Sequence, residues 1–156
     1  MLTLNCGCIG LNRTEMSRTD LERGDRSAAA EALSHWCWHT CQNESLVVGM
    51  AATNYAIEGA TGDWSSYICS STDYENGLPL ERRHRAMKWL KAHAQYDDIH
   101  PWQALAIITS VMGPSPSDRD VRALERAVRK SYDYMSLTQD ECLLADRAAV
   151  EIGKAA

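Results

Sequence analysis

The sequence lacks the features that would assign it to a membrane, to nucleic acid or to the secretory pathway. None of its apolar runs approaches the roughly 20 residues of a membrane-spanning helix. Its 16 basic and 21 acidic residues give a formal net charge of −5, whereas a nucleic-acid-binding surface needs a basic stripe. The N-terminus has no apolar stretch behind basic residues, so we expect no signal peptide. These absences predict a cytoplasmic protein that binds neither nucleic acid nor membrane.

Strand patterns are also missing, and this absence narrows the fold class. No segment alternates apolar and polar residues between hairpin turns, which argues against a sheet. Phe is absent although the chain has 5 Trp and 6 Tyr, and we have no physical account of this bias. Six Cys without a secretory signal are typical of reduced thiols or metal ligands rather than of disulfides. At 156 residues the chain is long enough for one domain with its own core. We predict an all-α fold.

Helical periodicity divides the chain near residue 43. Residues 1–42 show no sustained period apart from a short candidate helix at 31–42, so we predict a poorly ordered or unrelated N-terminal segment. Residues 43–156 are predicted to form one helical domain. Its main helices are expected at 44–58, 80–100, 102–112, and from Ser117 or Asp118 to 152. The helix at 102–112 is apolar nearly all round, which is typical of a buried helix.

Capping and breaking residues set these predicted helix ends. Asn43 is a plausible N-cap of the 44–58 helix, and Gly59 and Gly62 predict its end. Pro101 cannot donate an amide hydrogen, so the 80–100 helix must kink or restart there. The Gly-Pro-Ser-Pro string at 113–116 predicts a clear break before the last helix.

One cluster of polar residues on the predicted helices points to chemistry. At about 100° per residue, His93, Asp97 and His100 fall on one face of the 80–100 helix, together with apolar residues. Glu58 lies on an apolar face of the preceding helix. Two imidazoles with carboxylates suit a divalent iron or manganese, and zinc less distinctively. If the two helices pack together, Glu58, His93, Asp97 and His100 would converge as metal ligands. The simpler alternative is solvated side chains with ordinary hydrogen bonds.

Other candidate groups carry weaker signals. Cys6, Cys8, Cys37 and Cys41, with nearby histidines, could hold a zinc ion, but their spacing does not match common zinc sites. Free thiols are the simpler interpretation. The basic run at 82–85 opens a predicted helix and is either a solvated face or an anion site.

Two strings carry a family resemblance. Residues 54–65 (NYAIEGATGDWS) and 93–101 (HAQYDDIHP) resemble the iron-containing redox enzymes of the haem-oxygenase-like fold, in the TenA/PqqC superfamily. The resemblance covers about residues 43–152. It implies a haem-oxygenase-like helical bundle, with Glu58, His93, Asp97 and His100 as ligands of one or two non-haem iron ions. The members with the most similar pattern are di-iron oxidases and oxygenases, so it also implies dioxygen and a small organic substrate.

The chain departs from this family in its first part. The family fold is longer, and its first half carries another Glu and His that complete the metal site. We therefore expect a truncated member that keeps the C-terminal portion and lacks the N-terminal helices. Such a site would hold one metal ion, hold none, or be completed by a second subunit in a homodimer. The Cys and C-terminal Glu expected of a working TenA thiaminase are also not found.

Three functions follow from these observations. The resemblance implies an iron-dependent oxidase or oxygenase, an oxidoreductase whose metal site is incomplete. A non-catalytic helical fragment or interaction protein is the first alternative, because half a bundle should leave an apolar patch exposed at 102–112. A cofactor-free TenA- or PqqC-like small-molecule enzyme is the second alternative, with His93 and Asp97 as acid–base or hydrogen-bonding groups.

Overall fold

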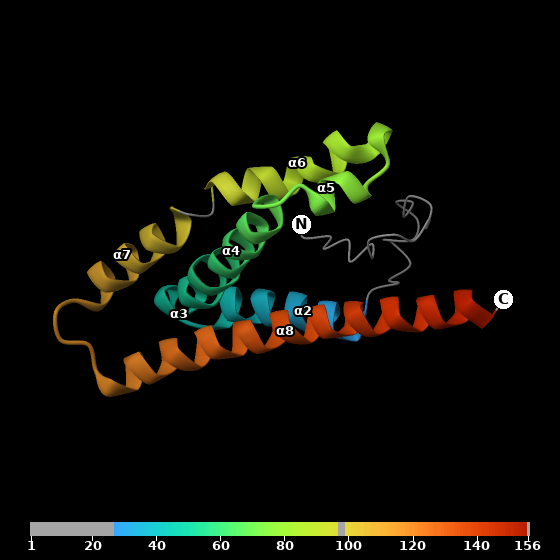
Figure 1. Ribbon diagram of the computed structural model, residues 1–156. Helices are drawn as coiled ribbons and strands as arrows, with labels where there is room; N and C mark the ends of the chain where they lie inside the picture. Colours follow the sequence, from blue (N-terminus) through green and yellow to red (C-terminus); the bar gives the residue numbers. More distant parts are fainter. Residues whose placement is uncertain (1–26, 97–98, 156) are drawn as a thin grey trace.

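The computed structural model describes residues 27–96 and 99–155, and every regular element in these ranges is a helix (Figure 1). The all-α prediction is therefore confirmed. The elements are α2 (Ala28–Asn43), α3 (Leu46–Met50), the π-helix η1 (Ala51–Ile57), α4 (Glu58–Cys69), α5 (Asp73–Gly77), α6 (Leu80–Tyr96), α7 (His100–Met112) and α8 (Asp118–Ala155). The elements α3, η1 and α4 follow one another without a break, since the junction residues Ala51 and Glu58 are both helical.

The long helix α8 organises the bundle. Its 38 residues correspond to about 57 Å, which is longer than any other described element. Helix α2 lies alongside α8, and η1 packs against the same helix (Figure 1). Helix α7 covers η1, whereas α4 leads away from α8 to pack against α6. The η1–α4 stretch therefore connects the α2–α8 pair to the α6–α7 arm.

Polar contacts at two positions hold α2 against α8. Ser27 caps α2 by accepting a hydrogen bond from the Ala30 amide at 3.2 Å. The Ala29 amide donates to Glu141 Oε2 of α8 at 3.0 Å, which places an acidic group at the positive end of α2. Farther along, the Trp36 indole donates to the buried Ser131 hydroxyl at 2.8 Å. These bonds set the axial register of the two helices.

Small residues allow η1 to approach α8 closely. Ala51, Ala52 and Ala56 are almost fully buried, and Ala52 joins a core cluster with Val48 and Ala127 of α8. Side chains this short let two helix backbones come together. A second cluster of Leu33, Ile57 and Met135 joins α2, η1 and α8.

Two predicted helix boundaries near the candidate site are wrong. Asn43 does not cap the next helix. It is the last residue of α2, and its amide donates back to the His39 carbonyl at 3.0 Å. Gly59 and Gly62 do not end a helix, because α4 runs through both to Cys69. A helix-ending glycine usually has a positive φ, and among the described residues only Gly113 does, at 73°.

The predicted helix at 80–100 is two helices. Helix α6 ends at Tyr96, and α7 begins at His100 with Pro101 in its first turn. Proline fits the first turn of a new helix, where no amide donor is needed. His93 and His100 therefore lie on different helices, and the predicted single face is wrong.

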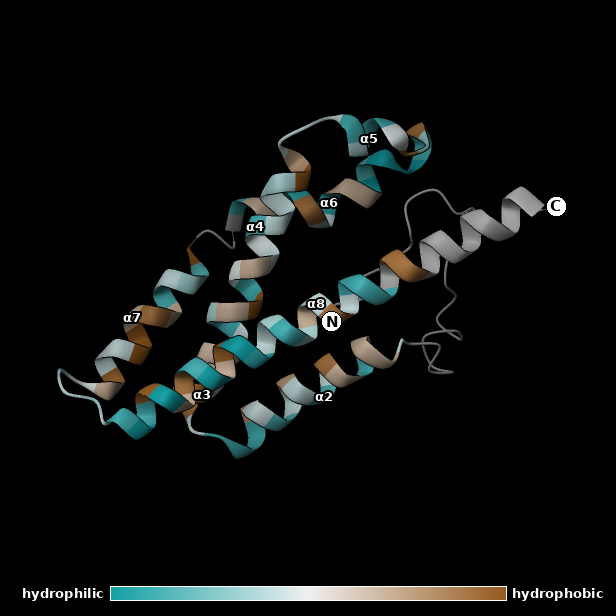
Figure 2. Ribbon diagram, turned by 60° about the horizontal axis from the view of Figure 1, so that its bottom comes forward, coloured by the Kyte–Doolittle hydropathy of each residue, from teal (hydrophilic) through white to brown (hydrophobic). Residues whose placement is uncertain are grey.

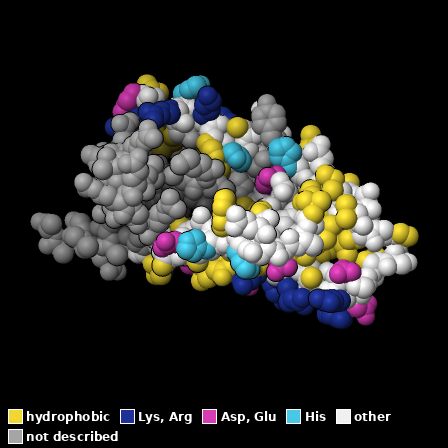
Figure 3. Space-filling view, turned by 180° about the vertical axis from the view of Figure 1, so that it is seen from behind, with side chains coloured by type: hydrophobic (Ala, Val, Ile, Leu, Met, Phe, Trp, Pro, Cys, Tyr) yellow, Lys and Arg dark blue, Asp and Glu magenta, His cyan; other side chains and the backbone are white. Residues whose placement is uncertain are grey.

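The prediction of a buried helix at 102–112 is also wrong. In α7 only Ala104 and Ile108 are buried, whereas Trp102 is 69% exposed and Val111 59% exposed. Figure 2 shows hydrophobic residues on α7, and Figure 3 shows a broad hydrophobic patch on that side of the molecule. Helix α7 is apolar, as its sequence shows, but no described helix covers its outer face. In the described ranges, no helix is both long enough and apolar enough to cross a membrane.

Candidate functional site

Glu58 and His100 form an acid–imidazole pair between two helices. Glu58 is the first residue of α4, His100 is the first residue of α7, and the Glu58 Oε2 to His100 Nδ1 distance is 3.3 Å. This distance allows an ion pair when the imidazole is protonated. The Glu58 side chain is 36% exposed and that of His100 is 50% exposed. A small molecule can therefore reach His100, whereas the Glu58 Oε2 atom is itself buried and faces the imidazole.

The π-helix η1 supplies the groups that orient Glu58. Asn54 Nδ2 donates to Glu58 Oε1 at 2.9 Å, which leaves Oε2 directed at His100. The Thr53 hydroxyl lies 3.1 Å from Asn54 Oδ1 and 2.8 Å from the Gly49 carbonyl oxygen. π-Helical turns are rare and occur frequently at functional sites. The wider turn ends directly before Glu58, so it sets where this carboxylate points.

A close helix contact brings His100 to Glu58. A Cβ atom added to Gly59 would lie only 3.3 Å from Pro101 Cγ, tighter than an ordinary van der Waals contact. Glycine at this position therefore lets α4 approach the start of α7. Because Gly59 follows Glu58 and Pro101 follows His100 in sequence, this contact brings the two functional side chains together.

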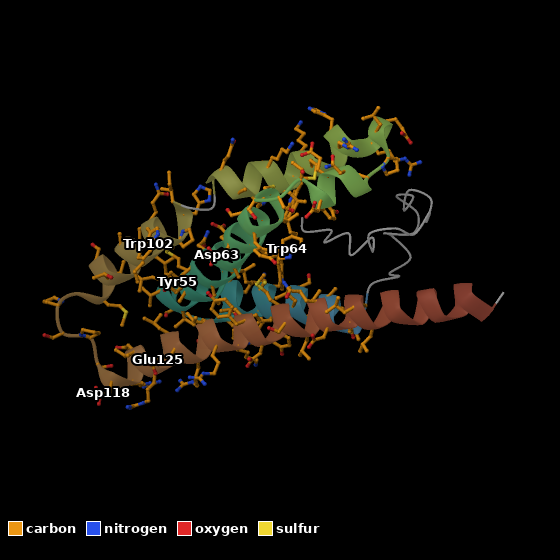
Figure 4. All side chains as sticks on the ribbon, viewed as in Figure 1. Tyr55, Asp63, Trp64, Trp102, Asp118 and Glu125 are labelled. Carbon is orange, nitrogen blue, oxygen red and sulfur yellow. The ribbon has the colours of Figure 1, made fainter. Side chains whose placement is uncertain are left out.

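His93 lies in an aromatic row along the α4–α6 interface. Its Nδ1 is 2.8 Å from the Trp89 carbonyl oxygen. A carbonyl can only accept a hydrogen bond, so Nδ1 carries the proton and Nε2 is the basic nitrogen. The His93 ring stacks on Trp89 with centroids 3.9 Å apart, and Trp89 contacts Trp64 of α4 at 6.2 Å. Figure 4 labels Trp64 on α4, close to Asp63.

The predicted metal ligands are only partly brought together. Glu58 and His100 are neighbours, His93 lies on the preceding helix, and Asp97 lies outside the described residues. Within residues 27–96 and 99–155, no three His, Cys, Asp or Glu side chains gather in a way that could hold a metal ion. The described side chains thus do not complete a metal site, and the iron ligand set remains a prediction.

The cysteine-based zinc site remains equally unsupported. Cys6 and Cys8 lie outside the described residues. Cys37 and Cys41 are free thiols one turn apart on α2, the first half-buried and the second exposed. Burial raises the pKa of the Cys37 thiol, with a smaller contribution from Cys41, so this thiol stays protonated. A neutral thiol is a poor metal ligand.

Sequence reasoning missed part of the polar surroundings. The pKa of the Tyr132 phenol on α8 is raised, first by burial and then by Tyr55 and Asp63. The last two residues lie on the η1–α4 stretch (Figure 4). The support of Glu58 by Asn54 was also missed, although their spacing of four residues was visible. Likewise, Trp89 and His93 are four residues apart. The influence of Tyr55 and Asp63 on Tyr132, which lies on another helix, left no local signal.

These observations define a helical bundle with an oriented acid–imidazole pair whose imidazole is half exposed. A comparison with solved structures shows which proteins share this bundle. The chain is similar to a TenA homolog from Pseudomonas syringae pv. tomato str. DC3000, with 52% sequence identity and a TM-score of 0.76. The similarity covers 81% of this chain and 52% of that protein, so the chain spans about half of its length. No family model matches the sequence, and the search of curated proteins found no match.

The similarity supports a place for this chain in the TenA/PqqC-like helical superfamily. It agrees with the resemblance seen in residues 54–65 and 93–101. It does not support the di-iron oxidase type, which was our main expectation. The TenA-like small-molecule enzyme, our second alternative, fits the comparison better.

Proposed function

We propose that this chain acts as a TenA-like small-molecule enzyme in which Glu58 and His100 move a proton to and from the substrate. The observation that carries the proposal is the 3.3 Å contact between Glu58 Oε2 and His100 Nδ1. A carboxylate and an imidazole within hydrogen-bonding reach of one another are a common arrangement for general acid–base catalysis. The 52% identity to a TenA homolog supports the enzyme class.

The geometry assigns a role to each group. Asn54 holds Oε1 of Glu58, and Oε2 is buried beside His100 Nδ1, so the carboxylate orients the imidazole. His100, whose side chain is half exposed, takes a proton from one substrate atom and returns it to another, while Glu58 stabilises the protonated imidazole. The charged pair that forms transiently is stabilised by its own attraction, because it is partly shielded from water. The protein's contribution is thus orientation and proton transfer.

The aromatic row offers a surface for the carbon skeleton of the substrate. Trp64 lies six residues after Glu58 on α4, about 9 Å along the helix axis. The rings of Trp64, Trp89 and His93 follow one another from α4 to α6. Aromatic rings bind apolar and planar groups well, whereas the acid–imidazole pair supplies the polar contact. We therefore expect a partly apolar substrate.

Turnover of a panel of small organic molecules, followed by mass spectrometry, tests this proposal. Glu58→Gln keeps the shape of the side chain and His100→Gln keeps a polar side chain, and each change removes the proton-transfer function. We expect each change to lower turnover by about 100-fold or more. Glu125→Gln, an exposed acid on α8 (Figure 4), is the matched control and should leave turnover unchanged. Full turnover by both site variants would refute the proposal.

A metal-dependent version of this enzyme is a second candidate. The Nδ1–H of His93 donates to a backbone carbonyl, which is the usual way a metal-binding histidine is oriented with Nε2 toward the ion. Such an ion would supply Lewis-acid or redox chemistry. The described residues bring only Glu58 and His100 together, so we derive no step through a metal.

Anaerobic titration with ferrous iron, followed by metal analysis of the washed protein, tests the second candidate. We expect iron to be retained by the wild type and to be lost in His93→Ala. Equal, negligible iron in both proteins would refute it, without any effect on the proton-transfer proposal. The comparison of activity with and without a chelator then separates the two candidates.

The exposed outer face of α7 favours a third candidate, an interaction protein. Trp102, Ile107 and Val111 are large apolar side chains at the surface, and patches of this kind often mark association sites. Self-association as a homodimer is one form of this candidate. Light scattering after size-exclusion chromatography should show a dimer that Trp102→Ser converts to a monomer. A monomeric wild-type chain would refute this form.

A further inference from the structure

A mainly apolar cavity with basic side chains on its wall lies between α5 and α6, apart from the Glu58–His100 pair. Its volume is about 510 Å³. The described residues that line it carry both basic and apolar side chains. The main ones are Glu75, Leu80, Arg83, Met87, Lys88 and Lys91. Neither Glu58, His93 nor His100 lines it. The basic run at 82–85, which the acid–imidazole pair does not use, contributes Arg83 and His84 to this wall.

The charges at this cavity are not balanced. Lys91 Nζ binds both carboxylate oxygens of Glu75, at 3.0 and 2.9 Å, so that pair is neutral. Arg83 and Lys88 then remain as cations. This local excess is positive in a chain whose formal net charge is −5. A concave wall of one charge sign concentrates the field and attracts ions of the opposite sign.

Arg83 is held in place by backbone carbonyls at the C-terminal end of α5. Its Nη2 donates to the Asn76 carbonyl at 3.3 Å and to the Leu78 carbonyl at 3.4 Å. Its Nε is buried and has no hydrogen-bond partner in the part of the chain that the structure describes. The fixed guanidinium thus gives the cavity a positioned positive charge.

We propose that the α5–α6 cavity binds a small organic anion, with a phosphate or carboxylate group on an apolar body. Arg83 and Lys88 attract the oxyanion through charge-assisted hydrogen bonds. Leu80, Met87 and Ala92 provide apolar surface for the carbon chain. The cavity therefore matches an amphiphilic anion better than a bare inorganic ion.

Calorimetric titration with four probes tests the proposed ligand class. The probes are hexyl phosphate, hexanoate, inorganic phosphate and hexanol. We expect saturable binding of hexyl phosphate or hexanoate at least about tenfold tighter than that of hexanol or inorganic phosphate. Tighter binding of hexyl phosphate identifies a phosphate ligand, and tighter binding of hexanoate a carboxylate ligand. Equal binding of hexanol, or no saturation by either anion at millimolar concentration, would overturn the proposal.

Three variants locate the binding. Arg83→Lys keeps the charge but removes the guanidinium fork, and Lys88→Gln removes a charge from an exposed side chain without disturbing the Arg83 hydrogen bonds. Each should weaken binding of the preferred anion by about five- to tenfold. Arg82→Gln is the matched control, because Arg82 is an exposed neighbour that does not line the cavity. Equal weakening by Arg82→Gln and Lys88→Gln would show non-specific attraction and overturn the assignment.

A spectroscopic measurement gives an independent readout that needs no catalytic activity. The Nε–H of Arg83 is buried, so it should exchange slowly with water and be visible in a nitrogen–proton NMR spectrum. We expect this signal to move in a saturable manner as the preferred anion is added. The signals of Arg82 should stay in place. Movement of Arg82 alone would place the anion outside the cavity.

Discussion

The hydrogen bond between Asn54 and Glu58 can be tested by moving the charge from one residue to the other. Asn54→Asp keeps the side-chain shape but replaces the donating amide with a carboxylate, 2.9 Å from Glu58 Oε1. A hydrogen bond to a charged group contributes about 1.5–3 kcal/mol. Two like charges at this distance add about 1–5 kcal/mol of repulsion, depending on the effective dielectric. The 36% exposure of the Glu58 side chain favours the lower part of that range.

We therefore expect Asn54→Asp to lower the free energy of unfolding by about 2–4 kcal/mol. Glu58→Gln alone should cost less than about 1 kcal/mol, because the amide oxygen at position 58 still accepts from Asn54. In the double variant the amide at position 58 donates to the new carboxylate at position 54. Most of the lost stability should then return, with a coupling energy of about 2 kcal/mol between the two positions.

Urea unfolding followed by circular dichroism measures all four proteins of this cycle. Asn76→Asp adds the same negative charge on an exposed side chain and should change stability by less than about 0.5 kcal/mol. The destabilisation by Asn54→Asp should also shrink below about pH 4, where carboxyl groups become protonated. Additive effects of the two single changes, within about 0.5 kcal/mol, would refute the assigned contact.

Three further predictions concern the core, the pH dependence and the thiols. Met87 is 1% exposed, so Met87→Ala should lower the free energy of unfolding by about 2–5 kcal/mol, as measured by urea midpoints. The raised pKa of Tyr132 means that the unfolded chain releases this proton first, so stability should fall as pH rises above 10.0. Tyr132→Phe should lessen that fall. Iodoacetamide should modify the exposed Cys41 faster than the half-buried Cys37, whose pKa is raised, as mass spectrometry can show.

The start of α8 was predictable because local chemistry determines it. The Gly-Pro-Ser-Pro string breaks the chain at 113–116, and the next residue, Ser117, accepts a hydrogen bond from the Asp120 amide at 3.2 Å. Residues a few positions apart supply both signals. The same applies to Pro101, whose missing amide donor predicted a kink or restart of the helix.

The candidate site was only half predictable. Glu58 and His100 could be selected because acids and imidazoles on apolar helix faces need partners. Their contact depends on Gly59 against Pro101, where two helices from different parts of the chain meet. We predicted a helix end at Gly59 because the sequence alone does not distinguish a glycine that ends a helix from one that makes room for a neighbouring helix. His93 does not share a helix face with His100, because α6 ends at Tyr96 and a separate helix, α7, begins at His100.

Local sequence features were enough to predict that the described part of the chain is helical, where α8 starts, and which acid and imidazole were candidates for chemistry. These properties depend on periodicity, capping and side-chain type, which act over a few residues. The packing of the helices was needed to show that Asn54 orients Glu58, that α7 leaves its outer face exposed, and that Arg83 lines a cavity with Lys88. Periodicity defines the faces of a helix, but what covers each face depends on helices that are distant in sequence.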